Sequence, residues 1–88
     1  MATYSIVFKK AAEKDLAAVN LRDRQRIGAA IDQLAATPRP HGCEKLSGPE
    51  SLWRIRIGDF RVIYQIEDHT VTVTVIRIGN RRDVYRRR

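Results

Sequence analysis

The stretch that decides the fold of this 88-residue chain is residues 52–80, LWRIRIGDFRVIYQIEDHTVTVTVIRIGN. From 53 to 57, apolar residues alternate with arginines, which is the period of a half-buried strand. Gly58-Asp59 interrupts this pattern, and a second alternating run covers 60–66. Glycine in the first central position is what a two-residue type II′ turn requires. The sequence therefore predicts an antiparallel hairpin, followed by a third strand at 71–78.

The two-residue turn also predicts the register of the hairpin. Arg56 lies directly opposite Arg61, and Arg54 points the same way two residues along its strand. Like charges directly opposite each other destabilise a sheet, so a purely structural role explains these arginines poorly. We interpret the face as an anion-binding site. The alternative is that the arginines spread apart into water on an open face.

A second turn, around Asp68-His69, would fix the position of the third strand. If that turn also has two residues, Arg61 faces Ile76. The segment that follows, 79–85, then lies just past the same end of the sheet. It would add three side chains to the arginine face: Arg81, Arg82 and Tyr85. Such arginines could bind consecutive phosphates, and the tyrosine ring could stack on a splayed-out base of single-stranded RNA. Alternatively, the ring packs by its edge and anchors the C-terminus.

The residues before the hairpin predict one strand and two helices. Residues 3–8 form a first strand, and 10–19 have apolar residues at helical spacing. Asn20 is a good N-cap for a second helix, which Thr37-Pro38 ends. The loop beyond it holds a short candidate strand, Lys45-Leu46. The order β-α-α-β-β-β predicts an α+β fold, with a helical hairpin packed on one face of a small, antiparallel-rich sheet.

Composition excludes several classes of protein. The length predicts one domain, residues 1–88, and no run of residues is long and apolar enough to cross a bilayer. One cysteine, Cys43, and two histidines are too few for a convincing zinc site, so we expect neither metal nor cofactor. The first residues lack the pattern of a secretory signal, and we expect a cytoplasmic protein. The formal net charge is +7, and every basic residue after position 50 is an arginine, which favours bidentate binding of phosphate.

The stretch 52–85 resembles the C-terminal half of the RelE group within the RelE/ParE toxin superfamily. The shared pattern is a basic-x-basic strand, a tight turn, an aromatic-Arg-hydrophobic-x-Tyr strand, and a strand ending in Gly-x-Arg with a nearby Val-Tyr. The first strand, the helical hairpin and the stretch Lys45-Leu46-Ser47-Gly48 also agree. The resemblance covers essentially the whole chain.

The resemblance implies a ribosome-dependent mRNA endoribonuclease, the toxin of a type II toxin–antitoxin pair that inhibits translation. It uses no metal, because the 2′-hydroxyl of the RNA attacks the adjacent phosphate. By position, the residues that match the catalytic set are Arg54, Arg56, Arg61, Arg81 and Tyr85. The first two contact the scissile phosphate, the third holds it, the fourth assists the leaving oxygen and the tyrosine orients the nucleotide. We expect further RNA contacts from Lys45, Arg77, Arg82 and Arg86.

This chain departs from the family pattern in one chemical respect. Lysines often occupy the positions of Arg54 and Arg56 in the family, and arginine effectively never loses a proton. We expect no glutamate or histidine near the site, since Asp59 is in the turn and His69 lies at the opposite end of the hairpin. The sequence therefore predicts a slow catalyst that depends on the ribosome to arrange its substrate.

The resemblance also implies partners, and it leaves rival functions open. The implied partners are a cognate antitoxin, the 70S ribosome with mRNA, and operator DNA only as the toxin–antitoxin complex; no membrane is involved. The antitoxin would cover the cationic face or the outer side of the helical hairpin. One rival is a ParE-like toxin that poisons DNA gyrase without nuclease activity. Another is a non-catalytic nucleic-acid-binding protein, and an inactive relic of a toxin is a further possibility.

Overall fold

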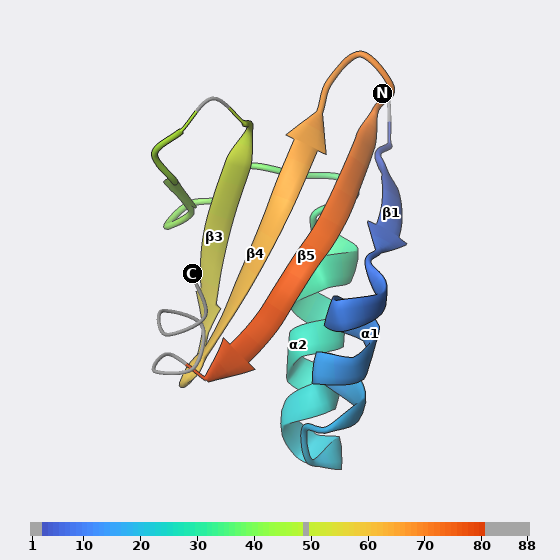
Figure 1. Ribbon diagram of the computed structural model, residues 1–88, viewed down its shortest axis with the longest axis vertical. Helices are drawn as coiled ribbons and strands as arrows, with labels where there is room; N and C mark the ends of the chain where they lie inside the picture. The colour runs from blue at the N-terminus through green and yellow to red at the C-terminus, as the bar shows by residue number, and fades with distance from the viewer. Residues whose placement is uncertain (1–2, 49, 81–88) are drawn as a thin grey trace.

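The structure is a computed structural model that describes residues 3–48 and 50–80, and it confirms the α+β fold (Figure 1). Its elements, in chain order, are β1 Ser5–Phe8, α1 Lys10–Ala17, α2 Leu21–Gln33, β2 Glu44–Lys45, β3 Leu52–Ile57, β4 Phe60–Glu67 and β5 Thr72–Asn80. In Figure 1, α2 lies behind the five-stranded sheet, and α1 lies to the right of β5, below β1. Among the described residues, this arrangement leaves the opposite face of β3 and β4 without a helix.

The sheet is mixed, with the strand order β1-β5-β4-β3-β2. Three neighbouring pairs are antiparallel, in agreement with the antiparallel-rich sheet that the sequence predicts. The fourth pair, β1 with β5, is parallel, and the sequence pattern did not identify it. A parallel pair needs a crossover connection, which here begins with the two helices and continues through β2, β3 and β4.

Helix α2 begins where the sequence predicts. The Asn20 side chain accepts a hydrogen bond from the backbone N–H of Asp23 at 2.9 Å, so it satisfies one of the free donors of the first turn. The carboxylate of Asp23 also lies close to the positive end of the helix dipole. The chain leaves the helix before Thr37-Pro38, because a residue that precedes proline avoids helical geometry.

The core lies between α2 and the sheet. Ile27 and Ile31 repeat at helical spacing and are 0% and 1% exposed. They belong to one cluster with apolar side chains from one face of the strands. The buried members that the strands provide are Ile55, Val62, Tyr64, Ile66, Val73, Val75 and Ile78. Burial of this face fixes which strand residues point away from the helices, because side chains alternate between the faces of a strand.

The hairpin of β3 and β4 has the predicted register. Ile57 pairs with Phe60 and Arg56 with Arg61, so Gly58-Asp59 forms the whole turn. Gly58 has a φ of 60°, the left-handed value that the first central position of a type II′ turn requires. The turn therefore places two arginines opposite each other on adjacent strands.

The register of β5 differs from the prediction. Arg61 pairs with Gly79, not with Ile76. The connection from β4 is longer than two residues, since Glu67 pairs with Thr72, and an irregularity shifts the register between Ile63 and Tyr64. Strand β5 consequently runs to Asn80, beside the Gly58-Asp59 turn, and glycine replaces isoleucine as the neighbour of Arg61.

Two glycine-to-alanine substitutions should have opposite effects on stability. Gly58→Ala should lower the free energy of unfolding by about 1–2 kcal/mol, because alanine is strained at positive φ. The new Cβ would also meet the guanidinium of Arg26. Gly28→Ala, inside α2, should raise the free energy of unfolding by about 0.5–1 kcal/mol, since a Cβ there meets nothing within 4 Å. Urea unfolding of both variants measures the difference, and a Gly58→Ala variant as stable as the wild type would contradict this assignment of the turn.

Candidate functional site

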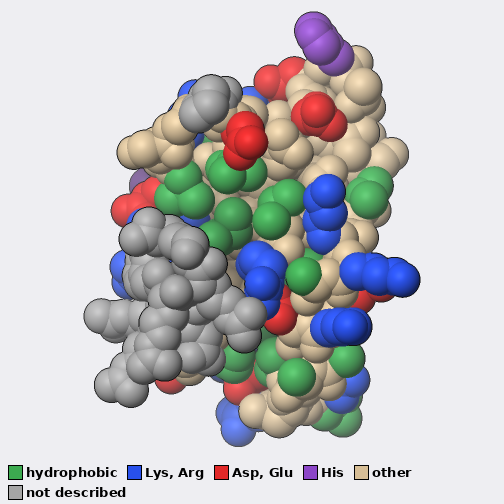
Figure 2. All heavy atoms as spheres, in the orientation of Figure 1, with side chains coloured by type: hydrophobic (Ala, Val, Ile, Leu, Met, Phe, Trp, Pro, Cys, Tyr) green, Lys and Arg blue, Asp and Glu red, His purple; other side chains and the backbone are tan. Residues whose placement is uncertain are grey.

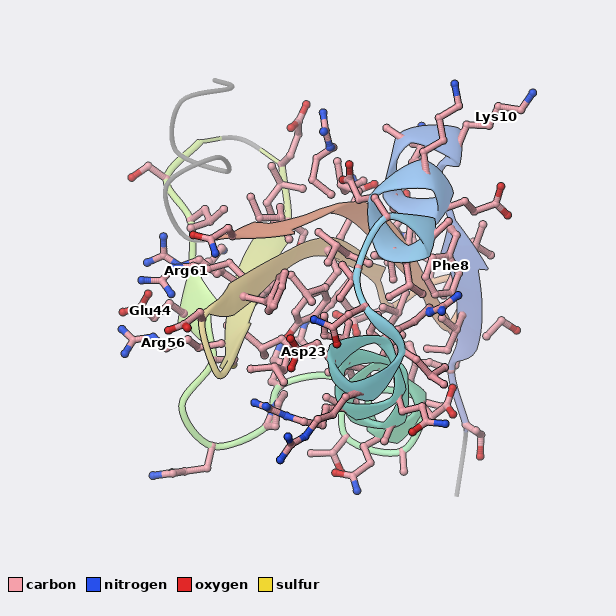
Figure 3. All side chains as sticks on the ribbon, turned by 90° about the horizontal axis from the view of Figure 1, so that it is seen from below. Phe8, Lys10, Asp23, Glu44, Arg56 and Arg61 are labelled. Atoms are coloured by element: carbon pink, nitrogen blue, oxygen red, sulfur yellow. The ribbon has the colours of Figure 1, made fainter. Side chains whose placement is uncertain are left out.

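Three arginines from β3 and β4 form the centre of the candidate site. Arg56 and Arg61 are direct cross-strand partners, and Arg54 lies two residues from Arg56 on the same face of β3. Figure 3 shows Arg56 and Arg61 at the same side of the sheet, away from the two helices. The face that bears these three residues is called the arginine face below. The structure thus brings together the three catalytic candidates that lie in its described part.

Arg61 occupies an unusual environment for an arginine, because only 6% of it is exposed. It lies between Arg56 on β3 and Gly79 on β5, which has no side chain to fill the space beside it. The Arg54 side chain is 18% exposed, whereas Arg56 is exposed to solvent. The cross-strand pair therefore combines a buried guanidinium, that of Arg61, with an exposed one, that of Arg56. Because Arg61 is largely shielded from water, its electrostatic interactions are stronger than those of an exposed arginine.

A carboxylate lies beside these arginines, so the expectation that no glutamate is near the site was wrong. Glu44 pairs with Arg54 across β2 and β3, and its Oε1 atom accepts a hydrogen bond from Arg54 Nη2. Figure 3 shows Glu44 close to Arg56 and Arg61. The hydrogen bond and charge of Arg54, with further attraction from Arg56 and Arg61, lower the pKa of Glu44 below its usual value. The carboxylate therefore stays ionised at neutral pH.

Sequence reasoning missed Glu44 because β2 has only two residues. The sequence predicts the short strand at Lys45-Leu46, whereas the structure has it at Glu44–Lys45. A strand this short has no alternating pattern from which its register can be read. One signal was available, because opposite charges at Glu44 and Arg54 flank a loop that contains Gly48.

A groove of about 540 Å³ adjoins the site between α2, the loop that follows it, and β3. Its lining residues are Ala30, Gln33, Leu34, Thr37, Pro40, His41, Gly42, Glu44, Arg54, Ile55, Arg56 and Ile57. Two members of the arginine face thus also border this groove. His41 lines the same groove.

Two of the four predicted RNA-binding residues lie within the described part of the chain, and each has a partner inside the protein. Arg77 donates from Nε and Nη2 to the Asp15 carboxylate of α1, at 2.8 and 3.1 Å. The same carboxylate accepts the backbone N–H of Ile78 at 3.0 Å. The Lys45 Nζ atom lies 6.0 Å from the centroid of the Trp53 ring. Neither contact brings these residues into the arginine face.

Four predicted residues lie outside the described part of the chain: Arg81, Arg82, Tyr85 and Arg86. Their predicted roles stay predictions.

Within the described residues, basic charge is not confined to the arginine face. Exposed lysines from the start of α1 and its surroundings, Lys9, Lys10 and Lys14, contribute to basic surface on the side of the molecule that carries β1 and α1 (Figure 2).

A second polar cluster, at the opposite end of β4, has a structural role. Asp68 accepts hydrogen bonds from the Tyr4 hydroxyl at 2.6 Å and from Arg39 Nη2 at 3.0 Å. These contacts connect the chain before β1, the loop after α2 and the connection between β4 and β5. The Tyr4 and Arg39 hydrogen bonds lower the pKa of Asp68.

Neither a metal centre nor a membrane-spanning helix is found in the part of the chain that the structure describes. Within residues 3–48 and 50–80, no group of three or more His, Cys, Asp or Glu side chains is placed to hold a metal ion. Within the same residues, the helices are too short and too polar to span a membrane.

Comparison with known proteins gives the family. The family model described as ParE toxin of type II toxin-antitoxin system, parDE, matches residues 6–85. No curated protein sequence matches the chain.

Solved structures of RelE toxins share the fold. The toxin–antitoxin complex RelBE2 from Mycobacterium tuberculosis matches with a TM-score of 0.80 and 25% identity, over 92% of this chain and 94% of that chain. The archaeal RelE-RelB complex from Pyrococcus horikoshii has a TM-score of 0.80 and 27% identity, over 90% and 96% of the two chains. The isolated E. coli RelE toxin has a TM-score of 0.78 and 26% identity, over 94% and 92%. With the family match and this fold together, the chain belongs to the RelE/ParE superfamily as a RelE-type toxin of a type II toxin–antitoxin system.

Proposed function

We propose that this toxin is an mRNA endoribonuclease that acts on the ribosome and so inhibits translation. The observation that carries the proposal is the cross-strand pair Arg56 and Arg61, with Arg54 on the same face and Arg61 almost fully buried. Like charges directly opposite each other destabilise a sheet, and the single carboxylate of Glu44 lies beside three guanidinium groups. A phosphodiester is an anion that matches the planar donors of arginine.

The proposed reaction is attack of an RNA 2′-hydroxyl on the adjacent phosphorus. The bond from the 2′-oxygen to phosphorus forms while the bond from phosphorus to the 5′-oxygen breaks. A proton leaves the 2′-hydroxyl, and a proton reaches the departing 5′-oxygen. The products are a 2′,3′-cyclic phosphate and a 5′-hydroxyl. Because arginine does not exchange protons at neutral pH, the arginine face would act by binding and by stabilising the charge that develops on the phosphate.

The proposed roles follow the family resemblance position by position. Arg54 and Arg56 contact the scissile phosphate and its surroundings, and Arg61 holds that phosphate. Arg81 assists the leaving oxygen and Tyr85 orients the reacting nucleotide; both lie outside the described residues. With these groups, catalysis depends on placing the 2′-hydroxyl in line with the leaving oxygen. We therefore propose that the ribosome supplies this alignment, and that activity is confined to the cytoplasm, where ribosomes are.

The same proposal includes a cognate antitoxin. The similar structures from Mycobacterium tuberculosis and Pyrococcus horikoshii are complexes of a RelE toxin with its antitoxin. The net charge of +7 and the arginine face favour an antitoxin with an acidic segment. Operator DNA would be bound only by the toxin–antitoxin complex.

Cleavage of one mRNA, free and on ribosomes, tests this function. Purified toxin is added to translating ribosomes and to the same mRNA alone, and cleavage positions are mapped by primer extension. We expect cuts within the codon in the ribosomal A site and little cleavage of the free mRNA. A 2′-deoxy nucleotide at the cut position should block cleavage there, because the attacking hydroxyl is gone. Rapid cleavage of the free mRNA would contradict the dependence on the ribosome.

A gyrase assay addresses the second candidate function. The family model that matches this chain is described as a ParE toxin. The family resemblance gives ParE-like toxins a different function, inhibition of DNA gyrase without nuclease activity. Under the ribonuclease proposal, the toxin leaves DNA supercoiling by gyrase unchanged. Inhibition of supercoiling, together with intact mRNA on the ribosomes, would favour the ParE-like function.

A further inference from the structure

We propose that Glu44 is a built-in competitor for the RNA phosphate, which must displace its carboxylate from Arg54 when RNA binds. This inference rests on the proposed function, since it concerns the anion that the arginine face binds. It assigns to Glu44 a role that the family resemblance does not give to any residue of this chain.

The geometry places Glu44 where an incoming anion would lie. Glu44 is the cross-strand partner of Arg54, and Arg54 Nη2 donates a hydrogen bond to Glu44 Oε1. Figure 3 shows the Glu44 side chain near both Arg56 and Arg61. An ionised carboxylate and a phosphodiester each carry one negative charge and accept the same guanidinium donors. Both cannot use the same donor of Arg54 at once.

Exposure favours exchange of the two anions. The Glu44 side chain is 58% exposed, whereas the Arg54 side chain is 18% exposed. Ion pairs with an exposed partner contribute little to stability, so another anion can replace this carboxylate at a small free-energy cost. The guanidinium, which is mostly covered, can stay in place while the carboxylate moves into water.

The backbone around Glu44 allows this movement without disturbing the core. Strand β2 has two residues, and both are exposed. A hydrogen bond from the Leu46 N–H to the Leu52 carbonyl at 2.9 Å holds the following residue to β3. Another, from the Cys43 N–H to the Pro40 carbonyl at 3.0 Å, closes the turn before it. Rotation of the Glu44 side chain breaks neither of these bonds.

The charge of Glu44 also weakens the attraction that all three arginines exert on RNA. The pKa of Glu44 is lowered by Arg54 first and then by Arg56 and Arg61, so the carboxylate interacts with the whole arginine face. Removal of the charge while the side-chain shape is kept should therefore strengthen the binding of RNA. The effect should be largest at low salt, where charges are least screened.

The test compares Glu44→Gln with Glu67→Gln. Glu67 is an exposed carboxylate at the far end of β4, paired with Thr72, so its loss changes the net charge equally but away from the arginine face. The probe is a short fluorescent RNA with 2′-O-methyl groups, which cannot be cleaved, and its Kd is measured by anisotropy at several KCl concentrations. Glu44→Gln should bind about three- to fivefold more tightly than the unchanged protein at low salt, while Glu67→Gln should change the Kd less than about twofold.

The salt dependence gives a second readout. Glu44→Gln removes a negative charge that partly neutralises the arginine face. The plot of the logarithm of the RNA association constant against the logarithm of the salt concentration should therefore steepen by up to about one unit, and only for this variant. Glu44→Thr, which removes the charge and suits a strand, should behave like Glu44→Gln. Thermal unfolding of all variants shows whether they are folded.

Several results would overturn the inference. Equal Kd values for Glu44→Gln and Glu67→Gln would show a general charge effect, and weaker binding by Glu44→Gln would show that Glu44 supports the site. Unchanged RNA binding with loss of cleavage on ribosomes would make Glu44 a proton acceptor instead of a competitor. If none of the proteins binds the probe, the competition has no basis. In each case, the cleavage of mRNA on ribosomes by the wild-type toxin tests the proposed function independently of the role of Glu44.

Discussion

Replacement of Arg61 by alanine is expected to lower the rate of ribosome-dependent mRNA cleavage by about 10²–10³-fold, the usual cost of losing one preorganised group that stabilises transition-state charge. Arg61 is the most buried member of the arginine face, with 6% exposure, and it lies directly opposite Arg56. A buried guanidinium is already desolvated and held in place before the substrate arrives. It therefore stabilises charge on the phosphate more strongly than an exposed arginine does.

Two further variants isolate this effect. Arg61→Lys keeps the charge but loses the planar donors, so it should recover only part of the activity. Arg22→Ala removes an exposed arginine from α2, away from the arginine face, and should keep nearly full activity. Single-turnover cleavage on ribosomes gives the rates, and ribosome pelleting shows whether the variants still bind. Arg61→Ala with near-normal cleavage, or equal losses for Arg61→Ala and Arg22→Ala, would contradict a phosphate site at Arg61.

The largest loss of stability is expected from Ile27→Ala. Ile27 is fully buried in the cluster between α2 and the sheet, and this change should lower the free energy of unfolding by about 2–5 kcal/mol. For a chain of this size, even the smaller value corresponds to a decrease in Tm of about 8 °C or more. The cost is the lost burial of apolar area together with the cavity that remains.

Leu21→Ala, in the first turn of the same helix, is the matched control. Leu21 is 61% exposed, so its truncation should change the free energy of unfolding by no more than about 0.5 kcal/mol. Chemical unfolding, followed by circular dichroism, measures both variants. Similar effects at Ile27 and Leu21 would mean that α2 does not pack against the sheet through the face described above.

The features that could be predicted from the sequence depend on local chemistry. The N-cap at Asn20 and the turn at Gly58-Asp59 each involve groups a few residues apart, and both are confirmed. The opposition of Arg56 and Arg61 follows from that turn, because a two-residue loop fixes the register of its hairpin. The centre of the candidate site could therefore be predicted from the sequence alone.

The features that could not be predicted depend on pairing between distant segments or on backbone irregularities. The parallel pairing of β1 with β5 leaves no pattern in either strand. The predicted neighbour of Arg61 was wrong because the connection to β5 has four residues and includes Val71 at a φ of 51°, a value that branched residues rarely adopt. The irregularity beside Ile63 adds a further shift. The longer connection and the irregularity each moved the register of β5 relative to β4.

Glu44 shows the functional consequence of such an error. Its contact with Arg54 requires the register of a two-residue strand, which depends on tertiary packing and not on a sequence pattern. The arginines alone suggested a site without a carboxylate, whereas the structure places an ionised one among them. The net charge that RNA meets at this face is therefore lower than the arginines alone indicate.

The central claim is that the arginine face holds the phosphate that is cleaved. A cryo-electron microscopy structure of the toxin on a ribosome, with a 2′-O-methyl mRNA that cannot react, tests it most directly. We expect guanidinium nitrogens of both Arg56 and Arg61 within hydrogen-bond distance, about 2.7–3.0 Å, of oxygens on one phosphate in the A-site codon. If the mRNA instead runs along the helices, with no phosphate at the arginine face, the claim is wrong.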